Sequence, residues 1–128
     1  MLIDHATAYA EVSAAFASYE AALMANDLEA LDALFWRSPS TVRFGVGESL
    51  FGFDAIAAFR VGRTGGSPQR KLQATQIVCF NECYAVATTE FIREGETRVG
   101  RQSQSWVKFP EHGWRIVSAH VSLVAEKS

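Results

Sequence analysis

The segment at residues 100–122 reads GRQSQSWVKFPEHGWRIVSAHVS. A turn signal at 110–113 divides it, and both arms contain the Val, Ile, Phe and Trp residues that strands favour, so the segment predicts a β-hairpin. The first arm carries five consecutive polar residues at 101–105. Such an arm is either a solvated edge of the sheet or one wall of a pocket that needs hydrogen-bonding groups.

More strands precede this hairpin, and helices precede the strands. We expect strands at 70–80, 83–94, 97–109 and 114–125, separated by short turns into an antiparallel meander. Apolar spacings of three and four predict helices over 4–26, 28–35 and 55–62, with short strands at 41–44 and 49–51. This order predicts an α+β fold in which three N-terminal helices pack on a curved, mainly antiparallel sheet as a cone-shaped barrel. The natural pocket of a cone lies between the long helix and the concave sheet face.

Composition narrows the class of protein. A chain of 128 residues predicts a single domain over 1–128. A net charge of −2 argues against nucleic acid as a partner, and no apolar run is long enough to cross a membrane. We see no signal peptide and therefore expect a cytoplasmic protein with Cys79 and Cys83 reduced. The Asp, Glu and His residues are too scattered to predict a metal site, and no dinucleotide or phosphate-loop fingerprint predicts a cofactor.

Alternation along the strands groups the polar side chains, because successive residues point to opposite faces of a sheet. The groups are Tyr84, Val86, Thr88, Glu90 and Ile92; Gly100, Gln102, Gln104 and Trp106; and Ile116, Ser118, His120, Ser122 and Val124. If these groups line the pocket, Glu90, Gln104 and His120 are neighbours across the sheet. If the opposite faces line it, these groups are solvated or meet a second subunit. The sequence leaves both arrangements open.

Two residues of the first half are candidates for chemistry. Tyr19 lies on the apolar face of the predicted long helix, and a buried phenol needs a hydrogen-bond partner because an unpaired one costs about 1–3 kcal/mol. Arg43 alternates with Val42 and Phe44 and so points away from both. In a cavity its guanidinium offers a two-pronged donor that fits a carboxylate.

The chain also resembles a known family over nearly its whole length. The blocks that carry the resemblance are ALFW at 33–36, TVRFGVGESLFGFDAIAAFR at 41–60, GRQSQSW at 100–106 and GWRIVSAHVS at 113–122. They resemble the AtzH-like family, within the SnoaL-like or nuclear-transport-factor-two-like superfamily of cone-shaped α+β barrels. The family includes a 1,3-dicarboxyurea decarboxylase, and the resemblance implies a catalytic pair at Tyr19 and Arg43.

These observations combine into one hypothesis of mechanism, a cofactor-free decarboxylation of a small anionic substrate. Arg43 would bind one carboxylate and Arg63 the other, while Tyr19 would deliver a proton to the nitrogen that loses carbon dioxide. Gln104 and His120 would bond the carbonyl and amide groups of the urea.

Two roles are open for Glu90. It would act as a general base or as a partner for an arginine.

The alternative to an enzyme is a non-catalytic dimeric module that binds a small molecule or accompanies another protein. In either case we expect a homodimer formed through the sheet, because a face carrying Trp106, Val117 and Val121 would otherwise be exposed.

Overall fold

The computed structural model describes residues 1–126. Its elements are α1 (Ala6–Ala25), α2 (Leu28–Ala33), β1 (Val42–Phe44), β2 (Ser49–Phe51), α3 (Phe53–Gly62), β3 (Arg70–Phe80), β4 (Tyr84–Arg93), β5 (Gly100–Phe109) and β6 (Gly113–Leu123). The strands form one sheet in the order β2-β1-β6-β5-β4-β3, and every pairing is antiparallel except that between β1 and β6. The predicted α+β fold is therefore confirmed.

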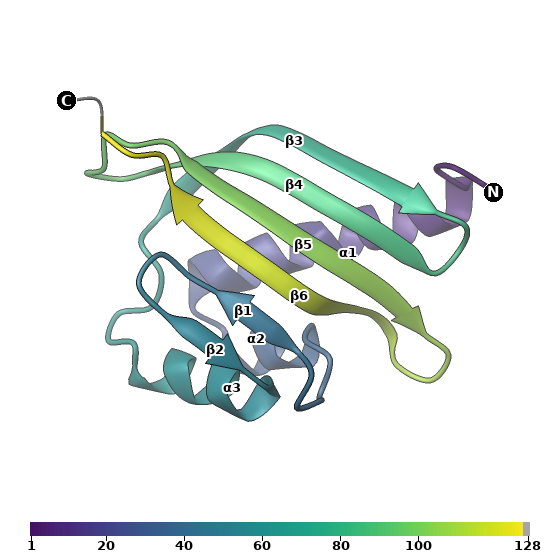
Figure 1. Cartoon of the computed structure of the whole chain (residues 1–128), viewed down its shortest axis with the longest axis horizontal. Coiled ribbons are helices and arrows are strands. Elements are labelled where there is room, and N and C mark those ends of the chain that lie inside the picture. The colour runs from purple at the N-terminus through teal and green to yellow at the C-terminus, as the bar shows by residue number, and fades with distance from the viewer. Residues whose placement is uncertain (127–128) are drawn as a thin grey trace.

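The long helix α1 lies across one face of the four long strands, and α2, α3 and the β1–β2 hairpin gather at one end of it (Figure 1). Its buried residues recur at helical spacing and include Val12, Phe16, Tyr19 and Leu23, so one apolar stripe faces the sheet. The helix begins later than the sequence predicts. His5, not an aspartate, is the N-cap and accepts a hydrogen bond from the Ala8 N–H.

Asp4, where the sequence predicts the helix to begin, lies before α1 and bonds the sheet instead. Asp4 takes a positive φ of 54°, and its side chain accepts a hydrogen bond of 2.8 Å from the backbone N–H of Cys79 in β3. The backbone N–H of Asp4 donates in turn to the Cys79 carbonyl. These bonds tie the start of α1 to the edge strand β3.

The sheet has an inner face toward α1 and an outer face. On β5 the buried residues are Gly100, Gln102, Gln104 and Trp106, so the polar set of this strand points inward. On β6 the pairing shifts between Ser105 and Trp106, so that Val117 is an extra residue in a β-bulge. The bulge reverses the alternation, because an inserted residue exchanges the two faces beyond it.

Two residues of the surface expected to form a dimer are buried inside the protein. Trp106 is fully buried and Val121 is 4% exposed on the inner face, so the prediction that these two residues form an exposed apolar face is wrong. The homodimer itself stays a prediction. Within residues 1–126, no helix combines the length and the apolar character needed to span a membrane.

Candidate active site

A pocket lies where α1, β1 and α3 meet. Its lining residues are Tyr19, Leu23, Arg43, Ile56, Phe59, Arg60 and Arg63. The pocket encloses about 220 Å³ of atom-free space, counting the part open to solvent, but no point of it is wide enough for a water-sized sphere. Side chains must therefore move before a ligand can enter. The pocket brings together three predicted site residues, Tyr19, Arg43 and Arg63.

Tyr19 supplies the phenol of the pocket. It lies on the buried stripe of α1 and is 3% exposed, and its ring packs against that of Phe35 with 6.2 Å between centroids. This packing holds the ring on the inner side of the helix. Tyr19 lines the pocket together with Arg43, Arg60 and Arg63.

Arg43 reaches the pocket from β1, between β2 and β6 in the sheet. Its neighbours Val42 and Phe44 are more exposed, so the predicted alternation places the guanidinium inside. There its Nη1 donates to Glu48 Oε1 at 2.9 Å, and its guanidinium carbon lies 5.8 Å from the centre of the Phe59 ring. The Glu48 carboxylate thus occupies one of the Arg43 N–H donors that a substrate carboxylate would use.

The helix α3 contributes two more arginines. Arg60 is 5% exposed, donates to Asp32 at 2.8 Å and lies 4.5 Å from the centre of the Phe35 ring. It follows the buried Ile56 by four residues, which places both on the inner face of the helix. Its Nη2 is buried without a hydrogen-bond partner among residues 1–126. Burial lowers the pKa of this guanidinium, although arginine stays protonated.

Arg63 ends α3 as its C-cap and shares the Phe59 ring with Arg43, with its guanidinium carbon 5.4 Å from the centroid. Its Nε is buried and finds no acceptor in the described part of the chain. Burial, and next the positive charge of Arg43, lower the pKa of Arg63. Two like charges beside one ring are unfavourable unless an anion lies between them.

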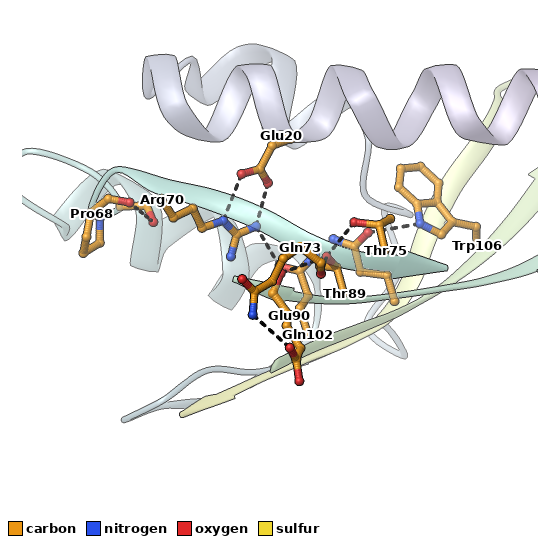
Figure 2. A network of polar contacts seen from close by, with 11 residues as sticks. Glu20, Pro68, Arg70, Gln73, Thr75, Thr89, Glu90, Gln102 and Trp106 are labelled. Carbon is orange, nitrogen blue, oxygen red and sulfur yellow. Dashed lines mark hydrogen bonds and ion pairs between the residues drawn. The ribbon is translucent and has the colours of Figure 1, made fainter. Parts of the chain in front are cut away.

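A second group of arginines adjoins the pocket on the inner face of the sheet. Arg70 of β3 donates to both oxygens of Glu20 at 3.0 and 2.6 Å and to Gln102 at 2.9 Å. Figure 2 shows Glu20 descending from α1 to this guanidinium. Arg93 pairs with Arg70 across β3 and β4, and its Nε is buried without a partner within residues 1–126. Burial, then Arg70 and Arg43, lower the pKa of Arg93.

These five arginines are incompletely neutralised. Arg43, Arg60 and Arg70 each form an ion pair with a carboxylate, those of Glu48, Asp32 and Glu20 respectively. Arg63 and Arg93 form no ion pair with any residue from 1 to 126. Two positive charges at and beside the pocket thus lack an ion pair, which favours binding of a small anion.

The remaining predicted site residues, Gln104, Glu90 and His120, do not all lie on the same face of the sheet. Gln104 is 1% exposed on the inner face and pairs with Ala87 and Ala119 on the flanking strands. Glu90 is half-buried on the outer face, where it accepts a hydrogen bond of 3.0 Å from Gln73, and Figure 2 shows it on the side of the sheet away from α1. The prediction that Glu90 lines the pocket is wrong, because the inner face of β4 carries the opposite set of residues.

His120 also lies outside. It is exposed and packs edge-on against the Phe44 ring at 5.7 Å between centroids. The bulge at Val117 causes this placement, since it exchanges inner and outer positions along the rest of β6. Glu90, Gln104 and His120 are therefore not neighbours, and neither Glu90 nor His120 can contact a ligand in the pocket.

The pocket combines a buried phenol with cationic groups and lies in a tightly packed interior. Such a site can bind a carboxylate by two charge-assisted hydrogen bonds and can place a proton donor beside it. In the part of the chain that the structure describes, no three His, Cys, Asp or Glu side chains gather as a metal site would require. Arg93 was not among the site residues predicted from the sequence, although alternation from Phe91 places it with the inner set of β4.

Comparisons with known proteins agree with this fold. A model of the AtzH-like family matches residues 1–127. The chain is 50% identical to a protein of unknown function from Pectobacterium atrosepticum (TM-score 0.92), over 96% of this chain and 95% of that one. It is 43% identical to a cystatin-like fold protein from Burkholderia xenovorans (TM-score 0.93; 99% of each chain). A nuclear transport factor 2 superfamily protein from Salmonella enterica is 28% identical (TM-score 0.77; 95% and 94%). No curated protein matches the chain.

Proposed function

The chain belongs to the AtzH-like family, and on that basis and on the chemistry of its pocket we propose that it decarboxylates a carboxylated urea or a similar small N-carboxylate. The proposed enzyme is a lyase that needs no cofactor. The observation that carries the proposal is the meeting of a buried phenol with three guanidiniums in one pocket, at Tyr19, Arg43, Arg60 and Arg63.

In the proposed reaction Arg43 binds the carboxylate that leaves, and Tyr19 is the proton donor. The C–N bond breaks, and its electron pair goes to nitrogen, which takes the proton of the Tyr19 hydroxyl. The carboxylate carbon leaves as carbon dioxide, and solvent returns a proton to the phenolate. Nearby guanidiniums stabilise the phenolate formed in this step, because fixed positive charge lowers the energy of a developing anion.

The charge of the site supports a dianionic substrate. Of the five arginines at and beside the pocket, Arg63 and Arg93 have no acidic partner within residues 1–126, and both have a buried Nε without an acceptor there. A substrate with two carboxylates would neutralise both charges and supply acceptors for both groups. A substrate with one carboxylate would leave one guanidinium unneutralised, at a cost that burial increases.

Two observations favour the alternative, a non-catalytic dimeric module that binds a small molecule or accompanies another protein. The pocket is closed to water-sized spheres, and Arg43 is already paired with Glu48. For the enzyme, Glu48 must give way to the substrate. For the module, the Arg43–Glu48 pair is a permanent part of the structure.

The two functions are distinguished by incubating the protein with freshly prepared 1,3-dicarboxyurea and related N-carboxylates and following carbon dioxide release against the spontaneous rate. The proposal requires a rate that rises with protein concentration and saturates with substrate. A rate equal to the protein-free control for every N-carboxylate, with binding still detected by calorimetry, would support the binding module.

A further inference from the structure

Two glutamines on the inner face of β5 have amide groups without acceptors. Gln102 is 3% exposed and Gln104 is 1% exposed, and the Nε2 of each is buried with no hydrogen-bond partner among residues 1–126. A buried donor left unpaired costs about 1–3 kcal/mol. The two unpaired amide groups lie two residues apart on the same face of one strand. We therefore look for one ligand group that would bind both of them.

The orientation of both amides is fixed by donors that bind their oxygens. Arg70 Nη2 donates to Gln102 Oε1 at 2.9 Å, and Trp106 Nε1 donates to Gln104 Oε1 at 3.1 Å. Neither an arginine nor an indole N–H can accept a hydrogen bond. Rotating either amide by 180° would thus place two donors face to face, so both NH₂ groups must remain available as donors.

The sheet places one of these amides close to the arginine pocket. Arg43 pairs with Ala119 across β1 and β6, and Ala119 pairs with Gln104 across β6 and β5. All three are buried on the inner face. Arg43 and Gln104 therefore stand two strand spacings apart, roughly 10 Å between backbones, with Ala119 as the residue of the sheet between them.

We propose that Gln102 and Gln104 form a donor pair that binds an acceptor oxygen of the ligand whose carboxylate is bound by Arg43. The ligand is then a small acid with acceptor oxygens at both ends, such as a second carboxylate or a urea carbonyl. Arg70 and Trp106 are positioning residues, because they hold the amide oxygens and leave the NH₂ groups free. This inference deepens the proposed function and rests on it for the location of the ligand.

Binding of malonate and of acetate tests the donor pair without requiring any turnover. Malonate has acceptor oxygens at both ends, whereas acetate has them at one. By titration calorimetry we expect the unchanged protein to bind malonate at least about tenfold more tightly than acetate, since a site that bonds a polar group discriminates against a ligand that lacks it. Equal affinity for the two acids would overturn the inference.

Two substitutions separate the donor role from a structural one. Gln102→Glu keeps an acceptor for Arg70 but replaces the NH₂ group by oxygen, and Gln102→Met removes the amide without adding charge. Arg70 retains both bonds to Glu20 in each variant. We expect both variants to lose a measurable part of the preference for malonate, the remainder being due to Arg63 and Arg93, while melting within a few degrees of the unchanged protein. An unchanged preference, or a loss only in a variant that has begun to unfold, would contradict the donor role.

Gln76→Glu is the matched control, because Gln76 is exposed on β3 and the substitution adds the same charge outside the cone. It should leave the preference unchanged. The result is independent of decarboxylation. A preference for malonate that depends on Gln102, in a protein that releases no carbon dioxide, would support the donor pair and refute the proposed reaction.

Discussion

Replacing Glu48 by glutamine should strengthen the binding of an anionic substrate. Glu48 Oε1 lies 2.9 Å from Arg43 Nη1, and its charge also acts favourably on Arg63 and Arg93. A substrate carboxylate that binds Arg43 must displace this internal carboxylate. Glu48→Gln removes the competing charge but keeps an oxygen that can accept a hydrogen bond.

The size of the expected gain in substrate affinity follows from how exposed the Arg43–Glu48 ion pair is. The Arg43 and Glu48 side chains are 11% and 24% exposed. At a charge separation of about 4 Å and an effective dielectric constant of about 20, the attraction is about 4 kcal/mol. Desolvation and the entropy of holding both side chains offset most of it, so that such a pair contributes on the order of 1 kcal/mol. The corresponding change in affinity is about fivefold.

Steady-state kinetics on the N-carboxylate identified by the carbon dioxide assay measures this effect. We expect KM to fall about fivefold in Glu48→Gln, with kcat not reduced. Malonate affinity measured by calorimetry should rise by a similar factor. A large fall in kcat would refute the reasoning, because it would make Glu48 a participant in the reaction. An unchanged KM would mean that Glu48 and the substrate do not compete for Arg43.

Three further predictions concern the charged groups. Arg63→Met should raise KM for a dianionic substrate at least about tenfold, since it removes an unpaired charge from the pocket; a change confined to kcat would argue against a binding role. Glu20→Ala should lower the free energy of unfolding by about 3–5 kcal/mol in chemical denaturation, because it leaves the buried guanidinium of Arg70 without its carboxylate. Glu11→Ala, which breaks an exposed pair with Lys108 and a hydrogen bond of 3.3 Å from Trp114 Nε1, should lower it by much less. The hydrogen bonds from the Arg98 side chain, and next from the Arg98 backbone, lower the pKa of Glu96 from 4.5 to about 2. Glu96 therefore contributes stability that is present above pH 4.5 and is lost as the pH falls toward 2, so thermal melts of Glu96→Gln and the unchanged protein should converge over that range, and a constant difference would contradict the assignment.

Much of the fold could be predicted from the sequence because the strands alternate regularly and the helices keep an apolar stripe. Alternation placed Arg43 opposite to Val42 and Phe44 in the same way, but it did not decide between a surface and a cavity for the guanidinium. The face of β6 could not be predicted, because the bulge at Val117 depends on pairing with β5 and leaves no local signal. His120 was therefore assigned to the wrong face.

The arginines show a second limit on what the sequence predicts. Arg60 stands four residues after Ile56, which indicates the inner face of α3, but a lone arginine on a helix is more often exposed. Its burial depends on Asp32 and the Phe35 ring, which come from a distant part of the chain. Arg93 was missed for the same reason: its neighbours Arg70, Arg43 and Glu48 are brought together only by the sheet and the β1–β2 hairpin.

The turnover of Tyr19→Phe at saturating substrate tests the role of the phenol most directly. The substitution removes one oxygen and keeps the ring that packs on Phe35, so the fold and the binding of malonate should persist. If the hydroxyl delivers the proton, the rate of carbon dioxide release should fall by about 10²–10⁴-fold. A variant that releases carbon dioxide as fast as the unchanged protein would remove Tyr19 from the reaction and with it the proposed mechanism.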